Sequence, residues 1–110
     1  MIAMNGTTRS EALTRKIVGL GATTCYRFNV DVANSPSSRQ DYLARAQGYM
    51  SGILLSRPTG TDDDLDLVPS TFGLLDQFEF LERFCAGNRT MDYGDAVEAL
   101  YKRLRQENRT

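Results

Sequence analysis

Two cysteines, Cys25 and Cys85, are the feature of this chain that most restricts its fold. One precedes the central helical pattern and the other lies on a later predicted helix, so the pair favours a single disulfide with a structural role. Such a bond would close a loop of about 60 residues, to which chain-entropy estimates assign roughly 4 kcal/mol of stability. It would also indicate an oxidising compartment, that is, a periplasmic or secreted protein. The alternative is a cytoplasmic protein with two free, buried thiols.

Histidine is absent from the 110 residues, and this absence excludes much catalytic chemistry. Without histidine there is no Ser–His or Cys–His nucleophile pair and no imidazole ligand for a metal. Two distant cysteines form neither a four-thiolate zinc site nor a C-x-x-C redox motif. The 13 basic and 14 acidic residues are spread along the chain and leave a net charge of −1, which offers nothing that would attract nucleic acid. We therefore predict no enzymatic activity, no metal, no cofactor and no nucleic-acid partner.

The sequence contains no apolar run long enough to cross a bilayer, so we expect no membrane insertion. The apolar stretch 17–22 is too short and too rich in glycine for a secretory signal peptide. We therefore expect either a cytoplasmic protein or an exported one whose signal peptide has been removed. The chain length predicts one domain over residues 1–110, with residues 1–7 disordered.

Helical signals dominate the chain from its first third onward. A capping box at 8–11 begins a short helix, which the glycines within 19–21 end. The segment 24–32 is ambiguous, because its apolar residues alternate as in a strand but also place Cys25 and Phe28 on one helical face. No other segment is a convincing strand partner, and a lone strand leaves its backbone groups unpaired. A helix or irregular structure is therefore favoured here.

A long central helix is predicted over 38–56, beginning at a capping box of Ser37 and Gln40. Its apolar face contains Tyr42, Leu43, Ala46, Tyr49, Met50, Ile53 and Leu54. A second stripe of small residues recurs every four positions and consists of Ala44, Gly48, Gly52 and Ser56. Each glycine costs roughly 1 kcal/mol against alanine inside a helix. The stripe therefore predicts close packing within the molecule, with a homodimer seam or ligand groove as the alternative.

Residues 57–66 form a predicted acidic surface loop. Asp62, Asp64 and Asp66 have the spacing that begins a calcium-binding loop. Leu67, however, occupies the turn position at which such a loop requires glycine. We therefore predict a solvated loop in which Asp66 caps a short turn.

Two further helices are predicted, from Pro69 to about Ala86 and from Asp92 to about Gln106. The first has an apolar face made of Leu74, Leu75, Phe78, Leu81, Phe84 and Cys85. The second has an apolar face made of Ala96, Val97, Leu100, Tyr101 and Leu104. Phe72 and Phe80 lie partly off the first face, where they can cover the loop or a partner. The pattern as a whole predicts an all-α, single-domain bundle of about four to five helices.

Several short motifs between residues 24 and 105 are similar to those of small exported helical proteins of bacteria. They are Cys25 with Phe28, the run Gly48-Tyr49-Met50-Ser51-Gly52, Cys85 before Asn88, and Ala96-Val97-x-x-Leu100. In these positions the chain resembles the HdeA family of periplasmic acid-stress chaperones and the helical immunity proteins that neutralise type VI secretion effectors. The resemblance implies an exported helical bundle with one disulfide from an early segment to the third main helix. It also implies a function in binding other proteins.

The sequence leaves three hypotheses about function. The first is a periplasmic protein-binding module, such as an inhibitor or immunity protein, that meets a basic partner through Tyr42, Tyr49, Asp62, Asp63 and Asp64. The second is an acid-activated chaperone, because protonation of the 14 carboxylates would leave a charge of about +13 and loosen the fold. The third is a cytoplasmic helical adaptor with free thiols.

Overall fold

The computed structural model describes residues 23–108 of the chain. Over these residues the fold is all-α, with helices α1 (Cys25–Asn34), α2 (Pro36–Ser56), α3 (Leu74–Gly87) and α4 (Tyr93–Glu107). A disulfide joins Cys25 to Cys85. The predicted all-α bundle with one disulfide is therefore confirmed. The short helix and the disordered start that we expected before residue 22 lie outside the described residues.

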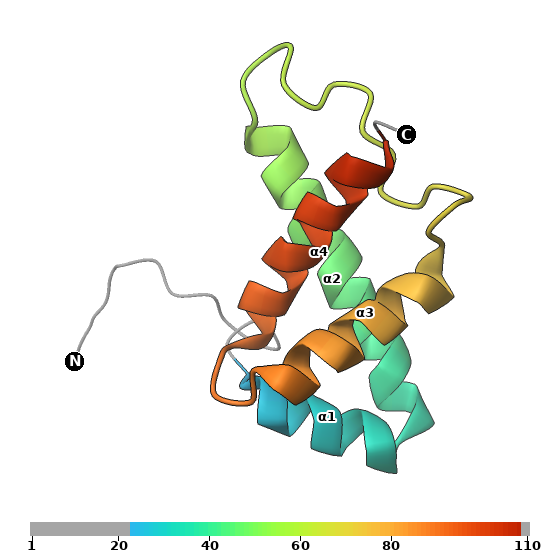
Figure 1. Ribbon diagram of the computed structural model, residues 1–110, viewed down its shortest axis with the longest axis vertical. Helices are drawn as coiled ribbons and strands as arrows, with labels where there is room; N and C mark the ends of the chain where they lie inside the picture. Colours follow the sequence, from blue (N-terminus) through green and yellow to red (C-terminus); the bar gives the residue numbers. More distant parts are fainter. Residues whose placement is uncertain (1–22, 109–110) are drawn as a thin grey trace, which may run out of the picture.

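The four helices share one core, and the connection between α2 and α3 lies at the end opposite α1 (Figure 1). Both α1 and α4 pack against α2 and α3. The core cluster consists of Cys25, Phe28, Val32, Tyr42, Ala46, Met50, Phe78, Leu81, Cys85, Tyr93, Ala96, Val97, Leu100, Tyr101 and Leu104. All five residues predicted for the inner face of the last helix are among them.

Two of the helices begin at side-chain caps, which explains where they start. Thr24 precedes α1, and its hydroxyl accepts a hydrogen bond from the backbone N–H of Arg27 at 3.1 Å. This cap resolves the ambiguous segment 24–32 as a helix. At α4, Asp92 and Asp95 form a reciprocal capping box. The prediction that Asp92 caps the last helix is confirmed.

The start of α2 differs from the prediction. The helix begins at Pro36, because proline is well suited to the first turn, where its missing N–H would have no partner. Its N-cap is Ser35, which makes no side-chain capping bond. Ser37 therefore lies inside the helix, and the predicted capping box of Ser37 and Gln40 is wrong.

The start of α3 also differs, by several residues. Residues 69–72 form a turn in which the N–H of Phe72 donates to the carbonyl of Pro69, and Gly73 is the N-cap. The helix thus begins at Leu74, where the prediction placed its second turn. Leu74 and Leu75 are 42% and 72% exposed, so their assignment to the buried face is wrong.

Candidate functional site

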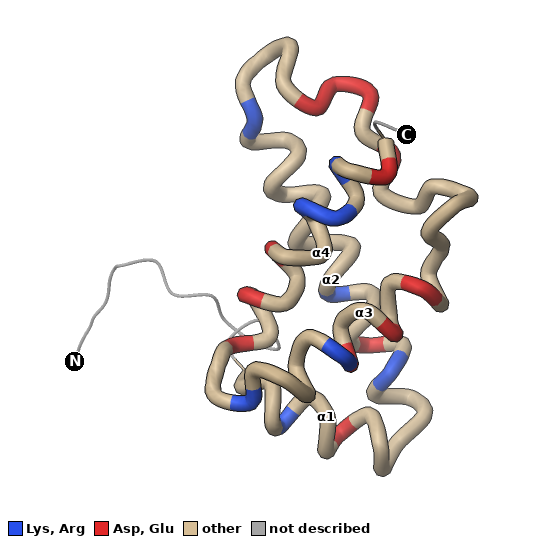
Figure 2. The backbone as a smooth tube through the Cα atoms, viewed as in Figure 1, with Lys and Arg blue, Asp and Glu red and all other residues tan. Residues whose placement is uncertain are grey.

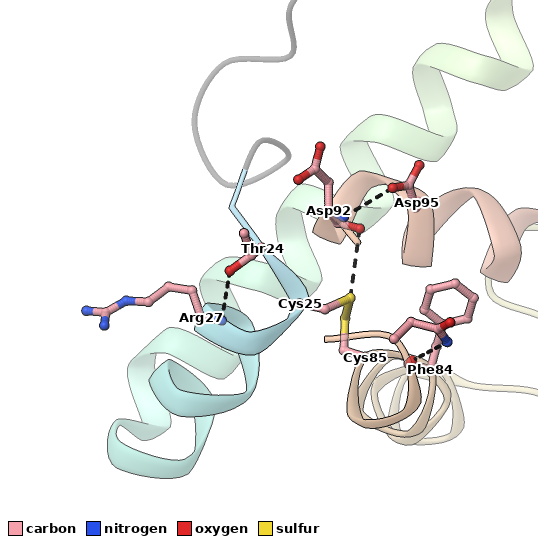
Figure 3. Close-up of a disulfide and its surroundings, with 8 residues drawn as sticks. Thr24, Cys25, Arg27, Phe84, Cys85, Asp92 and Asp95 are labelled. Atoms are coloured by element: carbon pink, nitrogen blue, oxygen red, sulfur yellow. Dashed lines mark hydrogen bonds between the residues drawn. A yellow bond between two sulfur atoms is a disulfide. The ribbon is translucent and has the colours of Figure 1, made fainter. Parts of the chain in front are cut away.

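The disulfide joins the first residue of α1 to the last turn of α3, beside the start of α4 (Figure 3). Both Cys25 and Cys85 are fully buried. The backbone N–H of Cys25 donates to the carbonyl of Met91, and the N–H of Tyr93 donates to the carbonyl of Thr23, each at 2.7 Å. The bond therefore holds three helix ends together and has no exposed sulfur, as a structural disulfide requires. The sulfurs are bonded, so the free-thiol prediction is wrong for this structure.

An aromatic cluster fills the core next to the disulfide. The ring of Phe28 lies 4.9 Å from that of Tyr42 and 4.8 Å from that of Tyr93. The hydroxyl of Tyr93 donates to the carbonyl of Tyr42 at 2.7 Å, and the hydroxyl of Tyr42 donates to the carboxylate of Asp31 at 2.7 Å. Burial, assisted by Asp31, raises the pKa of Tyr42 to about 12. Tyr42 is only 2% exposed, so its assignment to a partner-binding surface is wrong.

Asp62 of the acidic loop bonds to other side chains of the protein. Its carboxylate accepts hydrogen bonds from Arg105 at 3.0 Å and from the hydroxyl of Tyr101 at 2.9 Å, and it pairs with Arg57 at 3.4 Å. Burial, assisted by Asp62, raises the pKa of Tyr101 against the smaller lowering effect of Arg57. Asp62 has a φ of 60°, a left-handed conformation that aspartate tolerates better than most residues. This carboxylate therefore fastens the loop to α4.

The other residues of the predicted surface lie apart from this buried carboxylate. Asp63 and Asp64 are exposed at the end of the molecule opposite α1, where Figure 2 shows the acidic run of the loop. Asp63 also accepts the N–H of Gly60 at 3.1 Å. Tyr49 is half-buried, and its hydroxyl donates to Glu98 of α4 at 2.7 Å. Burial, assisted by Glu98, raises the pKa of Tyr49 to about 12.

The small-residue stripe on α2 faces outward. A Cβ atom added at Gly48 or Gly52 would meet nothing within 4 Å, and Ala44 and Ser56 are exposed. The predicted close packing within the molecule is therefore wrong for the described part of the chain. A homodimer seam along the stripe stays a prediction.

A groove between α3 and α4 brings together residues that the sequence analysis did not assign to a site. Its volume is about 590 Å³, and it is lined by Phe72, Phe80, Phe84, Asp76, Glu79, Arg83 and Arg103. The three phenylalanines are partly buried against the core cluster. The rings of Phe72 and Phe80 meet edge to face at 6.4 Å. In the sequence, only the position of Phe72 and Phe80 off the apolar face of α3 indicated this groove.

Phe72, which comes from the loop, is held in place by α3 and α4. The fully buried side-chain amide of Gln77 donates to the carbonyls of Phe72 and Leu67, at 3.2 and 2.9 Å. The guanidinium of Arg103 lies over the Phe72 ring at 4.4 Å and is bound to Glu107 at 2.6 Å. Thus the groove has a preformed wall.

A smaller notch of about 330 Å³ lies between α2 and α4 and includes Arg57, Glu98, Tyr101 and Lys102 in its lining. Most of its polar groups already have internal partners. Arg57 pairs with Asp62, Tyr101 donates to Asp62, and Glu98 accepts from Tyr49. The α3–α4 groove is therefore the stronger candidate site, because the carboxylates of Asp76 and Glu79 in its lining form no hydrogen bond or ion pair with another residue of 23–108.

Within residues 23–108, no three acidic or cysteine side chains are grouped so that they could hold a metal ion. No helix in the same range has the length and apolar character needed to span a membrane. Searches of protein-family models, curated proteins and solved structures found no match to this chain.

Proposed function

We propose that this chain is a non-catalytic protein-binding module of an oxidising compartment, periplasmic or extracellular, and that it acts as an inhibitor or immunity-type protein. The observation that carries this proposal is the groove between α3 and α4, with its three partly buried phenylalanines. Phenyl rings that are accessible from solvent and held in fixed positions are typical anchors of protein–protein interfaces.

The apolar surface around the start of α3 adds support. Leu74 and Leu75 are exposed, and Val68 in the preceding loop is 45% exposed. Exposed large apolar side chains near one another commonly mark an interaction site.

The disulfide supports the oxidising compartment. It is fully buried and closes a loop with a sequence separation of 60 residues. Disulfides of this structural kind persist in the periplasm and outside the cell, whereas cytosolic thiols are kept reduced.

The test is site-specific photocrosslinking in the source cells. A photoreactive phenylalanine analogue replaces Phe80 in the groove, and in a control protein it replaces Leu55, which is 86% exposed on α2 and absent from the groove lining. We expect one defined adduct from the groove position and none from the control position. The partner is then identified by mass spectrometry and produced for calorimetry.

Calorimetry with the identified partner decides the proposal. We expect Phe80→Ser to lower the affinity at least tenfold, as truncation of a central aromatic anchor does, while Leu55→Ser leaves it unchanged. Circular dichroism establishes that both variants are folded. Equal affinities for the folded Phe80→Ser variant and the original protein would refute the groove as the docking surface.

A second candidate, the acid-activated chaperone, has support from the loop end. There Asp62 binds Arg57, Arg105 and Tyr101, and Glu107 binds Arg103 and Thr71. Arg103 and Thr71 lower the pKa of Glu107, so its stabilising contribution is present above its unfolded pKa and is lost as the pH falls through its folded pKa. Binding of a hydrophobic dye at pH 2 but not at pH 7 would support this function. A compact protein that binds no dye at pH 2 would exclude it.

A further inference from the structure

We propose that the α3–α4 groove recognises a dipolar segment of another protein, in which apolar side chains lie between a basic and an acidic residue. This inference rests on the proposed docking function and names the chemistry of the partner at the same groove. Three kinds of lining residue carry it, namely two carboxylates toward the start of α3, three phenylalanines, and a basic residue farther along α3.

The acidic end consists of Asp76 and Glu79, one helical turn apart on α3. Neither carboxylate has an ion pair or a hydrogen bond with another described residue. Asp76 lies in the first turn of α3, where the helix dipole stabilises a negative charge. Within residues 23–108 these two carboxylates therefore have no partner, and we expect them to be available to a cation of another protein.

The basic residues of the lining differ from each other. Arg103 donates to Glu107 through both Nε, at 3.1 Å, and a terminal nitrogen, at 2.6 Å, and its plane lies over Phe72. Its charge is balanced by Glu107 and its guanidinium rests on the Phe72 ring, so it acts as part of the groove wall. Arg83 has no such partner in residues 23–108. Only Arg83 therefore offers the groove a cation for an acidic group.

Three phenylalanines supply the apolar part of the lining. Phe80 and Phe84 lie one turn apart on α3, and the ring of Phe72 meets that of Phe80 edge to face. The volume of about 590 Å³ is within the usual range of 300–1,000 Å³ for ligand pockets and suits one or two large apolar side chains. An apolar pair in the partner would therefore pack against these rings, beside the charged residues of α3.

The spacing of the charges fixes the length of the recognised segment. Asp76 and Arg83 are separated by seven positions of an α-helix, which corresponds to about 10 Å along its axis. An extended chain covers about 10 Å in three residues. A segment that reaches both Asp76 and Arg83 is therefore four residues long, with the basic residue first or last and two apolar residues between the charges, and Glu79 lies within this span.

The test is a nuclear magnetic resonance titration with capped synthetic tetrapeptides. The probe is Lys-Leu-Phe-Glu, and the comparison peptides are Ser-Leu-Phe-Ser and Glu-Leu-Phe-Glu. We expect chemical-shift changes at Phe72, Phe80 and Phe84. We expect the affinity for the probe to be about three to ten times that for the serine peptide, as for two solvent-accessible charge pairs, and to fall with added salt. The glutamate peptide should bind most weakly.

A pair of matched variants tests the role of the acidic end. Glu79→Lys changes a lining residue, whereas Glu82→Lys makes the same charge change on the same helix outside the lining. We expect Glu79→Lys to abolish the preference for Lys-Leu-Phe-Glu over Ser-Leu-Phe-Ser. We also expect it to raise the affinity for Glu-Leu-Phe-Glu. Glu82→Lys should leave the preference unchanged.

The outcomes separate this inference from the docking function. If Phe80→Ser abolishes binding but the three peptides bind equally, the dipolar selectivity is refuted and the docking function stands. If the folded Phe80→Ser variant binds all peptides as the original protein does, the docking function fails as well. If sedimentation of the protein alone shows a dimer that Phe80→Ser dissociates, the occupant is a second copy of the chain, which also refutes the inference.

Discussion

The two ends of the molecule are held together by different forces. At the disulfide end, a covalent bond joins the start of α1 to the last turn of α3, and the stacked rings of Phe28 and Tyr93 join α1 to the start of α4. At the loop end, residues 57–73 are attached to α3 and α4 by polar side chains, above all Gln77 and Asp62, and by Leu65, Leu67 and Phe72, which are only partly buried against the core. The first end gains stability from full burial and cross-linking, and the second from partial burial and from hydrogen bonds that contribute only about 1 kcal/mol each.

This difference affects the groove, because part of the groove lining comes from the loop end. Phe72 belongs to the loop, while Phe80 and Phe84 belong to α3, whose last turn carries the disulfide. Segments fastened by few polar contacts open at lower free energy than a cross-linked core. The loop wall of the groove is therefore the part that opens first, and the α3 wall is the part that stays fixed.

Removal of the disulfide should have the largest effect. The double variant Cys25→Ala with Cys85→Ala should lose about 4 kcal/mol of unfolding free energy, because the unfolded chain is no longer closed into a loop of 60 residues. Urea denaturation measures the loss. Reductant should destabilise the original protein by a similar amount and leave the variant unchanged. A loss below about 1 kcal/mol would mean that aromatic packing alone holds this end.

Alkaline pH should weaken the disulfide end next. Burial raises the pKa of Tyr93, and it raises that of Tyr42 to about 12, from the ordinary value of 10.0. Between pH 10 and pH 11 both stay protonated when folded but ionise when unfolded, so stability falls as the pH rises. Each of these two tyrosines removes about 1.4 kcal/mol per pH unit, so the pair removes about 3 kcal/mol by pH 11, and Tyr49 and Tyr101, whose pKa values are also raised, add to the decline.

Urea denaturation at several pH values from 8 to 11 measures this decline. The variant Tyr93→Phe has one ionisable group fewer in the cluster, so its stability should decline less steeply above pH 10, even though it starts lower because the carbonyl of Tyr42 loses its donor. An equally steep decline in both proteins would show that other tyrosines cause it.

A change at Gln77 should affect the loop end by a smaller amount. Gln77→Met keeps the side-chain size but removes the donor to Phe72 and Leu67 and the acceptor for Gln47. Leaving such buried groups unpaired should cost about 2 kcal/mol. Hydrogen exchange should accelerate most in residues 66–73. The control Gln40→Met, at an exposed position, should change neither the unfolding free energy nor the exchange rates. Uniform acceleration across all helices would contradict a separately fastened loop.

The contrast between the two ends also explains which features could be predicted from the sequence and which could not. The buried face of α4 and the helix at 24–32 follow from apolar spacing and capping residues, which are local signals. Gln77 in the core was missed, since a polar residue is favoured inside only by carbonyls from a distant loop. Leu74 and Leu75 were placed inside because the turn at 69–72, which delays the helix, has no periodic pattern. The groove depends on these loop contacts, so its residues were only partly predictable.

The smallest predicted effect concerns α2, the helix that connects the two ends. Gly48 and Gly52 face open space, so alanine at either position should stabilise the protein by about 0.5–1 kcal/mol through higher helix propensity. Because α2 contacts both α1 and α4, the gain in unfolding free energy should leave the difference in local stability between the two ends unchanged. Thermal unfolding measures the gain and hydrogen exchange measures the local stability of each end, with Arg45→Lys, an exposed change of similar helix propensity on α2, as the control. A loss of stability that grows with protein concentration would instead mean that the stripe is covered in solution by a second copy.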